Sequence, residues 1–542
     1  MIVLGLHGGV TLGQHEPAAA LALNGRIVAL CEEERYLRVK SCYGMLPERS
    51  IHACLDLAGV KWGEIDLIVT PGITYSDVAD RWRNYLTHLF GSCPRLERVH
   101  HQAAHLNAAF YGSGVTDSLC LSLDASGDGA CGMTAEATRT GGLKILDEFP
   151  TSNSLGYFYT LMTYYCGFAD GDEYKLMGLA PYGRPDIDLT PIIRPVSGGW
   201  EFDWSYVRSN PAPKSPFEPQ YSSKLEKLLA QPNRKPGEPL NDFYRNVAAS
   251  AQKLMEDCLL SLVSSLHSKR PSARNLCYAG GVALNCSANR QLLANGFDHV
   301  YVSPVSSDRG LALGCAYAGA VMLGDRPWPL LDVYLGTEYP AATTEKELKA
   351  NSIRYRVVED AAEEGAKLLA QKKIVGWHQG RSEAGARALG NRSILAGCSD
   401  PEMRDLVNAR IKYREEFRPF APAVLQEELA TLFEVPQAAN GCDTDFPYMT
   451  FTLRARDEKV KGMQAVVHVD GTSRVQTVRS SNNDRYYDLI RQYAGVTGAP
   501  VIMNTSFNLK GQPIVETPRD ALMTFFGCGL DALLIGDFLI EK

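Results

Sequence analysis

The sequence contains a strand–turn–strand arrangement twice, and this repetition limits the folds that the chain can adopt. MIVLGLHGG reads as a buried strand that runs into glycines, and AAALALNGRIVALCEEE reads as two strands joined at Asn24-Gly25, a strong hairpin signal. SLCLSLDASGDGACGMTAEATRTGG again reads as two strands around a glycine turn. Apolar positions at helical spacing follow, for example in residues 49–60 and 243–268. These patterns predict a mixed α/β protein.

Composition restricts the environment of the protein. The chain has 542 residues, of which 45% are hydrophobic and 22% are charged, which permits several cores. Its net charge of -7 argues against non-specific adhesion to nucleic acid or membranes. No apolar run approaches the roughly 20 residues of a membrane span. The 14 cysteines include no C-x-x-C pair, so we expect a soluble, cytoplasmic protein with reduced thiols.

Two histidines and an aspartate form the first candidate site. His101 and His105 stand four residues apart, so a helix places both imidazoles on one face, and Asp124 follows at the end of an apolar strand. Two imidazoles and a carboxylate are a usual ligand set for a first-row transition metal. From the spacing alone, an exposed histidine pair and a solvated aspartate remain the alternative. A metalloprotease is excluded because Gln102 occupies the place of the general-base Glu in H-E-x-x-H.

Other charged residues of the N-terminal half have two interpretations each. His15, in a loop before an apolar strand, is either a surface histidine or a site residue. Arg35, Arg38 and Lys40 form either a solvated face or an anion-facing cluster, because guanidinium groups match phosphate and carboxylate geometry. Asp308 precedes a helix of small residues and is either a helix N-cap or a ligand.

Glycine turns provide candidate nucleotide contacts. Gly127, Gly129 and Gly132 match G-x-G-x-x-G formally, but the following residues alternate like a strand, whereas the dinucleotide fingerprint must open a helix. The turn, with Asp128 between its glycines, still offers backbone N–H groups to a phosphate. The pair Gly280-Gly281 permits close approach of a planar ligand, and Asn285 follows it on a predicted helix.

The middle of the chain adds ligand contacts and an insertion. Glu173 and Lys175 lie in a glycine-bounded segment, where we expect them to contact a ligand, while the aromatic residues around them belong to the core. Residues 184–240 contain many prolines and read as an insertion or lid. Residues 325–345 are rich in proline and aromatic residues and connect the two halves.

The C-terminal half concentrates cations beside small polar residues, which indicates a pocket for polyanionic ligands in an acidic chain. The candidates are Arg387, Arg392, Lys412, Arg418, His468, Arg474, Asn504 and Ser506. A nucleic-acid patch is disfavoured because exposed aromatic residues are not interleaved with the cations. The absence of a G-x-x-x-x-G-K-[ST] string excludes an ordinary P-loop ATPase.

Long strings spread over nearly the whole chain resemble one known family, the NodU/CmcH-type O-carbamoyltransferases. They occur in the family's order, and the C-terminal ones are highly specific. They are HEPAAALALNGRIVALCEEERYLRVK, RVHHQAAH, LSLDASGDG, GDEYKLMGLAPYG, YAGGVALN, SSDRGLALG, GWHQGRSEAGARALGNRSILA, REEFRPFAPAV, HVDGTSRVQTV and MNTSFNLKGQPIVETPRDAL.

The resemblance implies two modules. Residues 1–340 are expected to form an actin-like (ribonuclease-H-like, duplicated) ATPase-type domain with the metal and adenylate site. Residues 341–542 are expected to form a smaller α/β domain similar to the threonylcarbamoyl-adenylate synthase (YrdC-like) fold. Hydrogenase-maturation relatives share this architecture but carry C-x-x-C pairs, which this chain lacks.

The resemblance also implies roles for particular residues. His101, His105, Asp124 and Asp308 correspond to the family's metal site, with Fe(II) as the expected ion. His15 corresponds to a histidine near the acceptor hydroxyl, with Lys40 nearby and Glu16 where many relatives have Asp. The catalytic residues are therefore expected to be His15, Lys40 and Arg418. The expected nucleotide-binding residues are Gly127, Asp128, Gly129, Glu173, Lys175, Gly280, Gly281 and Asn285.

The implied reaction joins the two modules. The C-terminal module is expected to form carbamoyl-adenylate from carbamoyl phosphate and Mg-ATP. The N-terminal module would then transfer the carbamoyl group to a hydroxyl of an acceptor. The acceptor stays open between a natural product, a sugar and a hydroxymethylated base in DNA, and a homodimer is compatible with the sequence. The alternative function is a small-molecule kinase on the actin-like fold.

Overall fold

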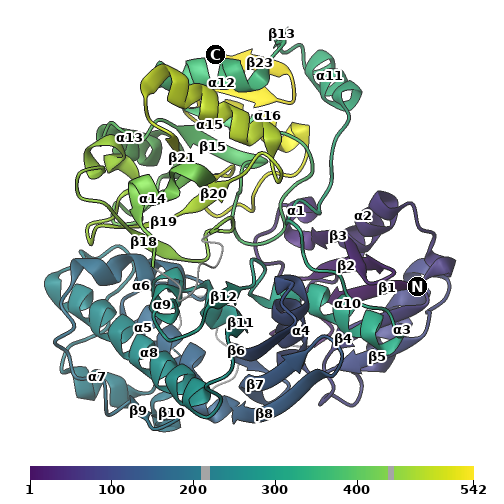
Figure 1. The fold of residues 1–542 in the computed structure, drawn as a ribbon, viewed down its shortest axis with the longest axis vertical. Coiled ribbons are helices and arrows are strands. Elements are labelled where there is room, and N and C mark those ends of the chain that lie inside the picture. Colours follow the sequence, from purple (N-terminus) through teal and green to yellow (C-terminus); the bar gives the residue numbers. More distant parts are fainter. Residues whose placement is uncertain (12, 209–219, 437–444) are drawn as a thin grey trace.

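The computed structural model describes residues 1–542 apart from 12, 209–219 and 437–444. Part of the predicted insertion at 184–240 therefore lies outside the described residues. The N-terminal half contains two five-stranded sheets side by side, and the C-terminal half forms a separate layered unit above them (Figure 1). The predicted mixed α/β class is confirmed.

The first sheet has the order β3-β2-β1-β4-β5. Its strands are β1 (Ile2–His7), β2 (Ala18–Leu23), β3 (Arg26–Glu32), β4 (Leu67–Pro71) and β5 (Leu96–Val99). The first three pair antiparallel, and β1, β4 and β5 run parallel. Asn24 and Gly25 both have positive φ, of 49° and 77°, which is the backbone of the predicted two-residue hairpin.

The second sheet repeats this order as β8-β7-β6-β11-β12. Its strands are β6 (Asp117–Gly127), β7 (Ala130–Thr138), β8 (Gly142–Pro150), β11 (Asn275–Ala279) and β12 (His299–Val302). Three antiparallel strands are again followed by two parallel ones. The duplication that the two strand–turn–strand segments predicted is therefore present in the structure.

Two helices lie between the sheets, α4 (His101–Ser113) and α10 (Leu311–Met322). Both are buried almost all round, so neither has a polar face. Small residues make this contact possible: a Cβ on Gly314 would lie 1.8 Å from the Ala104 carbonyl oxygen, and one on Gly5 would lie 2.0 Å from that of Ala312. The packing fixes the start of both helices, where candidate ligands lie.

Helices cover the outer faces of the N-terminal half. Beside the first sheet are α1 (Glu33–Leu37), α2 (Glu48–Ala58) and α3 (Val78–Phe90). Around the second sheet are α5 (Leu155–Tyr165), α6 (Glu173–Leu179), α7 (Ser223–Leu229), α8 (Asp242–Ser268) and α9 (Cys286–Leu292). A short hairpin, β9 (Ile193–Val196) and β10 (Gly199–Phe202), packs on α8.

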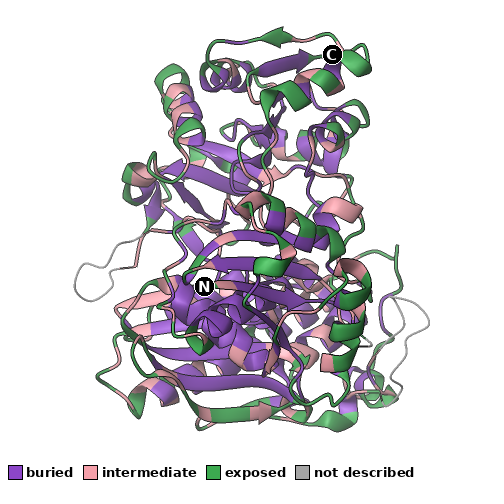
Figure 2. Cartoon of the chain, turned by 90° about the vertical axis from the view of Figure 1, so that its right-hand side faces the viewer, coloured by how far each residue is buried: buried purple, intermediate pink, exposed green. Residues whose placement is uncertain are grey.

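The C-terminal half contains an eight-stranded mixed sheet of order β13-β23-β22-β14-β15-β21-β16-β20. Its strands are β13 (Arg356–Val357), β14 (Val375–His378), β15 (Arg392–Ala396), β16 (Ala421–Leu425), β20 (Gln476–Val478), β21 (Val501–Ser506), β22 (Ala532–Ile535) and β23 (Phe538–Glu541). A smaller sheet joins β17 (Phe433–Glu434), β18 (Thr452–Ala455) and β19 (Thr472–Arg474). The strands are mostly buried (Figure 2).

Helices flank this sheet on both faces. On one face α12 (Ala361–Ala370) and α15 (Asp484–Thr497) share a core with Trp377 and Leu395. On the other, α16 (Pro518–Phe526) and α13 (Glu402–Val407) share a core with Ile394 and Phe507, and α11 (Ala341–Ala350) packs on α16. The remaining short helix is α14 (Leu429–Leu432).

The connection between the halves is irregular chain from Leu323 to Pro340, whereas residues 341–345 of the segment expected to connect the halves lie in α11. Side chains also cross the boundary: Arg38 donates to the carbonyl oxygens of Pro513 at 3.0 Å and Ile514 at 2.5 Å. Among the described residues, no helix combines the length and apolar character needed to cross a bilayer.

Candidate metal and anion sites

His101 and His105 occupy the first two turns of α4, with both Nε2 atoms directed at one oxygen of Asp124. His105 Nε2 lies 3.0 Å and His101 Nε2 lies 3.3 Å from Asp124 Oδ2. His105 is fully buried and its Nδ1 has no partner among the described residues. Two imidazoles that converge on a single carboxylate oxygen are arranged as ligands around one position rather than as a surface pair.

Asp308 completes the cluster from the opposite side. It begins a single 3-10 turn before α10, and its Oδ1 lies 3.5 Å from His101 Nε2 and 3.9 Å from His105 Nε2. The helical turn is preceded by Ser307 and has no side-chain cap, so the N-cap interpretation of Asp308 is not supported. One ligand atom from each of the four residues lies within 4.8 Å of the others, which fits a divalent cation.

The glycines predicted to contact nucleotide make room for this cluster. A Cβ on Gly127 would lie 2.2 Å from the His101 ring, and one on Gly281 would lie 2.8 Å from Asp124 Oδ1. Gly280, with φ of 94°, would place a Cβ 2.2 Å from the Leu123 carbonyl oxygen. Close packing against His101, Leu123 and Asp124 therefore requires these glycines, independently of any nucleotide.

The charges of the cluster are interdependent. Burial lowers the pKa of His101, but the carboxylates of Asp308 and Asp124 outweigh burial and raise it. Burial raises the pKa of Asp124, but hydrogen bonds from His101 and His105 outweigh burial and lower it. A divalent cation would supply the positive charge that the paired carboxylates require.

His7 lies beside the cluster although the sequence did not place it among the site residues. Its Nε2 lies 3.6 Å from Asp308 Oδ2 and 2.9 Å from the His15 carbonyl oxygen. Burial lowers its pKa to about 4, so the ring is neutral at neutral pH. The repeat contained a signal for His7. Leu4-Gly5-Leu6-His7 at the end of β1 matches Leu121-Ser122-Leu123-Asp124 in β6, so His7 takes the position of Asp124.

His15 and Glu16 lie next to Asp308. Burial lowers the pKa of His15, but Asp308, Glu16 and Asp124 outweigh burial and raise it. The Nδ1 of His15 is buried without a partner among the described residues. Glu16 instead bonds Arg309, which lowers the pKa of its carboxyl to about 2 against the effect of burial. Arg309 follows a metal-cluster residue and was not identified from the sequence.

The interpretations of Arg35, Arg38 and Lys40 as one solvated face or one anion-facing cluster are both wrong. Arg35 is buried against Glu32 and Glu34, and Arg38 reaches the C-terminal half. Lys40 alone is exposed, with its Nζ 5.5 Å from the centre of the Tyr174 ring. Burial cost explains the difference, because buried guanidinium groups need carboxylate or carbonyl partners.

Two of the remaining predicted nucleotide contacts, Asp128 and Asn285, bind other parts of the chain. Asp128 is buried and accepts from the backbone N–H groups of Gly72 and His101, at 3.1 and 2.8 Å. Asn285 caps α9 and exchanges hydrogen bonds with Gln252. These contacts account for both side chains as supports of the fold. Gly129, by contrast, faces open space in its turn.

Glu173 and Lys175 lie at the start of α6, against the C-terminal half. Burial raises the pKa of Glu173 to about 7, so this carboxyl is partly protonated at neutral pH. Lys175 Nζ bonds Asp172 at 2.7 Å and Glu415 of the C-terminal half at 3.2 Å. The segment therefore lies at the boundary between the halves.

Four arginines of the C-terminal half lie near one another, and together we call them the arginine pocket: Arg387, Arg414, Arg418 and Arg474. Burial and then Arg474 lower the pKa of Arg387 to about 9, and burial and then Arg418 lower that of Arg414 to about 9. Among the described residues, Arg418 alone of the four forms a salt bridge, to Glu415 at 3.5 Å. Cations held together without matching carboxylates favour an anionic ligand.

The arginine pocket faces the N-terminal half. The guanidinium carbon of Arg418 lies 4.6 Å from the centre of the Tyr174 ring, which Lys40 also approaches. Arg309, beside the metal cluster, contributes to the lowered pKa of Arg387. The two predicted sites therefore lie on either side of one boundary.

The other cations predicted for this pocket have partners inside the chain. Arg392 is fully buried and donates to backbone carbonyl oxygens, including those of Gln379 at 2.6 Å and Thr337 at 3.0 Å. Lys412 Nζ bonds three oxygens of Ser506 and Asn508. Their donors are used by the fold, so we leave both out of the ligand-binding set.

The polar residues predicted beside these cations are also engaged. The Asn504 amide nitrogen donates to Ala388 O at 3.1 Å and to Gln476 Oε1 at 2.9 Å. Ser506 Oγ bonds Asn508, and His468 Nε2 lies 3.2 Å from Phe417 O. Asn504 and His468 thus hold the backbone next to Arg387 and Arg418.

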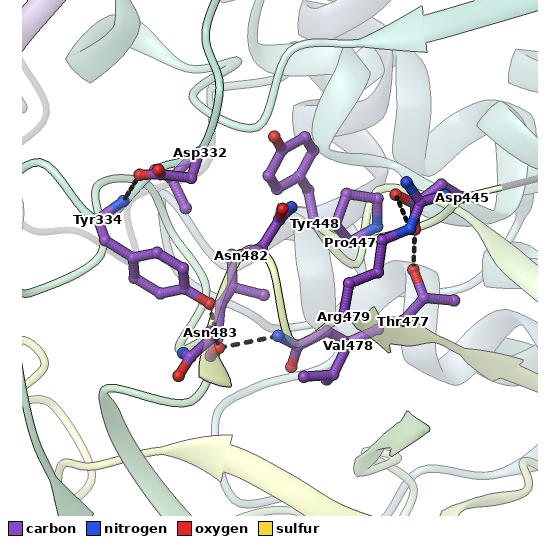
Figure 3. Close-up of a pocket in the computed structure, with 13 residues that line it drawn as sticks. Asp332, Tyr334, Asp445, Pro447, Tyr448, Thr477, Val478, Arg479, Asn482 and Asn483 are labelled. Carbon is purple, nitrogen blue, oxygen red and sulfur yellow. Dashed lines mark hydrogen bonds and ion pairs between the residues drawn. The ribbon is translucent and has the colours of Figure 1, made fainter. Parts of the chain in front are cut away.

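A hollow that contains none of the predicted site residues lies between the connection and the C-terminal half, and its lining includes Asp332, Tyr334, Tyr448 and Asn483 (Figure 3). A neighbouring cavity of about 480 Å³ shares Asp332, Tyr334 and Asn483 with it. No pattern in the sequence indicated either cavity.

The chain is similar to known carbamoyltransferases in both halves. Residues 89–317 match the model "Carbamoyltransferase N-terminus", and residues 366–542 match "Carbamoyltransferase C-terminus". Nodulation protein NolNO of Sinorhizobium fredii is 35% identical over 100% of this chain and 83% of its own. Nodulation protein NolO of Bradyrhizobium diazoefficiens is 39% identical over 82% of this chain and 79% of its own. The 3'-hydroxymethylcephem-O-carbamoyltransferase of Amycolatopsis lactamdurans is 32% identical over 68% of this chain and 65% of its own.

Similarity to solved structures is low. The Acidaminococcus fermentans (R)-2-hydroxyglutaryl-CoA dehydratase component A has 15% identity over 59% of this chain and 99% of its own, with a TM-score of 0.35. HypF of T. kodakarensis has 13% identity over 60% of this chain and 48% of its own, with a TM-score of 0.32. These scores are too low to support an argument about this chain.

The duplicated sheets, the four-residue metal-type cluster and the arginine pocket across the boundary belong to a mixed α/β protein with two candidate sites. The chain belongs to the carbamoyltransferase family that includes the NodU/CmcH-type enzymes. It is a carbamoyltransferase.

Proposed function

We propose that the protein is an ATP-dependent O-carbamoyltransferase with a divided reaction. Residues 341–542, with a YrdC-like fold, form carbamoyl-adenylate. Residues 1–340, with an actin-like fold, transfer the carbamoyl group to an alcohol. The observation that supports this division is the placement of the arginine pocket and the metal-type cluster on either side of one boundary.

The first half-reaction uses carbamoyl phosphate, water and Mg-ATP. Hydrolysis of carbamoyl phosphate releases phosphate and leaves carbamate, whose oxygen attacks the α-phosphorus of ATP as pyrophosphate leaves. Both substrates are polyanions, and the arginine pocket offers guanidinium donors with few competing carboxylates. Arg387, Arg418 and Arg474 are the residues that we assign to these phosphates.

In the second half-reaction, the acceptor hydroxyl oxygen attacks the carbamoyl carbon, and the bond from that carbon to the AMP oxygen breaks. His15 accepts the hydroxyl proton, since its ring lies beside the cluster with an unpartnered Nδ1. Arg309 bonds the Glu16 carboxylate and makes it a weaker base, so His15 is the residue that accepts the proton. Lys40 and Arg418, which both approach the Tyr174 ring, face the path of the anionic intermediate.

His101, His105, Asp124 and Asp308 would hold the metal, for which we propose Fe(II). Bound there, a divalent cation would act as a Lewis acid toward oxygens of the intermediate. Gly280 and Gly281 bring backbone close to Asp124, and we propose that the adenosine lies along this turn.

We propose a small molecule with a free hydroxyl as the acceptor. One relative is named for a hydroxymethyl group on a cephem, and the others for nodulation. The net charge of -7 also favours a small molecule over a hydroxymethylated base in DNA. The catalytic unit contains both sites in one chain, whether or not the chain forms a homodimer.

Nucleotide products test the mechanism. Incubation with ATP, carbamoyl phosphate and a hydroxyl-bearing acceptor should yield AMP and pyrophosphate in equal amounts. ADP as the nucleotide product would instead indicate a kinase and contradict the adenylate mechanism.

Replacement of Arg474 tests the arginine pocket. Arg474→Ala should reduce adenylate formation by more than about 100-fold, because a charged hydrogen-bond donor to phosphate is lost, while metal content stays normal. Pyrophosphate release and elemental analysis measure the two effects. Arg454→Ala is the control, because Arg454 lies on the neighbouring strand and is half exposed. Normal pyrophosphate release by Arg474→Ala would refute the assignment.

A further inference from the structure

Four consecutive charged residues are buried at the end of β3 and in α1. Glu32, Glu33, Glu34 and Arg35 are 4%, 1%, 7% and 3% exposed. Burial of charge costs free energy unless partners satisfy it. Glu33 is satisfied inside the N-terminal half, by the Ser50 hydroxyl at 2.6 Å and the Ser50 and Arg49 N–H groups at the start of α2.

Glu32 and Arg35 instead hold one residue of the C-terminal half. Glu32 Oε1 accepts from the Gly385 N–H at 2.5 Å, and Arg35 Nη2 donates to the Gly385 carbonyl oxygen at 2.8 Å. Gly385 has φ of 104°, and a Cβ there would lie 2.8 Å from the Pro304 carbonyl oxygen. Both backbone polar groups of this glycine are therefore fixed from across the boundary.

The other oxygen of Glu32 leads to the metal-type cluster. Glu32 Oε2 lies 2.9 Å from Nη1 of Arg309, which directly follows Asp308 in the chain. Arg309 also contacts Glu16 and donates from Nε to the Ser307 hydroxyl at 3.0 Å. Through its side chain, Arg309 therefore connects Glu32 to Ser307 and to itself, the two residues on either side of Asp308 in the chain.

On the other side, Gly385 stands two residues before Arg387 of the arginine pocket. The chain on both sides of this stretch is held: Ala384 N bonds Val333 O at 2.8 Å, and Asn504 holds Ala388 O at 3.1 Å. A displacement of Gly385 must therefore be passed to Arg387. Asp308, Arg309, Glu32, Gly385 and Arg387 form a continuous series of bonds between the sites.

We propose that Glu32 and Arg35 are positioning residues that couple the metal-type cluster to the arginine pocket, so that a ligand in one site changes affinity in the other. This inference rests on the proposed function, since it requires both sites to bind. Neither side chain needs to touch a substrate. Their role is to transmit position between Asp308 and Arg387.

Two substitutions cut the series at different points. Glu32→Gln keeps an oxygen for the Gly385 N–H but turns an NH₂ toward the Arg309 guanidinium, which removes that link. Arg35→Lys keeps the charge beside Glu32 but lacks the guanidinium fork that reaches the Gly385 carbonyl oxygen. Glu33→Gln is the matched control, because Glu33 is equally buried on the same segment and, among the described residues, bonds only the N-terminal half.

The experiment measures Fe(II) affinity of the full-length protein with and without a non-hydrolysable ATP analogue. We expect the analogue to change the Fe(II) Kd of the wild type by about 5-fold or more, within the usual range of coupling between sites. In Glu32→Gln and Arg35→Lys this ratio should fall close to 1, while each ligand alone still binds. Glu33→Gln should keep the wild-type ratio. Thermal unfolding confirms that each variant is folded.

The outcomes are distinct. A wild type that binds neither Fe(II) nor the analogue refutes the proposed function and this inference with it. A wild type that binds both with a ratio of 1 refutes only the coupling. Wild-type ratios in both Glu32→Gln and Arg35→Lys, or an equal loss in Glu33→Gln, overturn the role of Glu32 and Arg35.

Discussion

The shared oxygen of Asp124 determines the chemistry of the histidine pair. Both Nε2 atoms lie within 3.3 Å of Asp124 Oδ2, and His105 is completely buried. If one imidazole is removed, bulk water does not take its place at this buried position. The carboxylates of Asp124 and Asp308 then stay close together with less positive charge beside them. The cluster should therefore respond sharply to removal of a single ligand.

His105→Ala should lower metal affinity by more than the roughly 10–100-fold loss that follows removal of a residue that only hydrogen-bonds a metal ligand. Metal content of the purified protein and a direct Fe(II) titration measure this loss. His88→Ala is the control, because His88 is exposed on α3. An unchanged metal content in His105→Ala would remove the metal assignment.

Glu173 should give the protein a measurable pH dependence. Its pKa is raised from 4.5 to about 7, chiefly by burial, so the native state binds a proton more tightly than the unfolded chain. The free energy of unfolding should therefore fall as pH rises from about 4.5 to 7. A pKa change of this size corresponds to at most about 3 kcal/mol.

Glu173→Gln should remove this decrease, and urea unfolding at pH 5 and pH 8 measures it. Glu148→Gln is the control, because Glu148 is exposed on β8. An identical pH dependence in wild type and Glu173→Gln would show that Glu173 titrates normally.

Among single residues, the sequence predicted which side chains of the candidate metal cluster lie together better than it predicted the partners of the other charged residues. The spacing of His101 and His105 requires only a helix, which local pattern indicates, and the structure places both imidazoles together. Asp128, Arg392 and Lys412 carry the same chemical groups as true ligand contacts. Their partners come from distant segments, so composition and spacing could not show that they serve the fold.

The element that carries the histidine pair depends on a distant cap. Asp128 receives the His101 N–H at the first turn of α4 and also the N–H groups of Gly72 and Thr74 after β4. This carboxylate thus orients the start of α4 and joins the two sheets. Removal of Asp128 should lower the free energy of unfolding by an amount that depends on how many buried N–H groups lose their acceptor.

Asp128→Ala should lower the free energy of unfolding by at least about 2 kcal/mol, because several buried N–H groups lose their acceptor. Chemical denaturation measures the effect, and metal affinity should fall in parallel as α4 loses its orientation. Asp80→Ala is the control, since Asp80 is exposed and, in the part of the chain that the structure describes, pairs only with Arg83 on α3. A change below about 0.5 kcal/mol in Asp128→Ala would contradict this role.

For helices and strands, the sequence was most informative where a period or a turn residue was unambiguous. The hairpin at Asn24-Gly25 and the repeated strand–turn–strand segments are present as predicted. The burial of α4 and α10 on all sides was not predicted, since it depends on how two sheets approach each other. Small residues such as Gly5 and Gly314 are compatible with many other contacts.

At the scale of the whole molecule, side chains from the N-terminal half hold the C-terminal half in place. Arg38 bonds the carbonyl oxygens of Pro513 and Ile514, with Asp520 at 3.6 Å. The connection itself is irregular and exposes Trp328 and Leu331 to 57% and 61%. Side-chain contacts, rather than the connection, therefore hold the halves together.

Arg38→Ala should loosen this boundary and speed cleavage of the connection by chymotrypsin several-fold, because Trp328 and Leu331 become easier to engage. Limited proteolysis with mass analysis of the fragments measures the rate. Arg83→Ala is the control, since Arg83 is exposed and its only salt-bridge partner within the described ranges is Asp80 on its own helix. Equal cleavage rates in wild type and Arg38→Ala would contradict the role of Arg38.

The sequence alone determined the α/β class, the repeated sheet segments, the histidine pair and the family resemblance, because all of these are carried by residues close together in the chain. Only the tertiary structure showed which charges are available to a ligand. Lys412 and Arg392 are satisfied by carbonyl oxygens, whereas Arg387 and Arg474 lie near each other and form no salt bridge among the described residues, where the Arg474 Nε also has no partner. Pairing of a charge depends on segments hundreds of residues away, and folding alone brings those segments into contact.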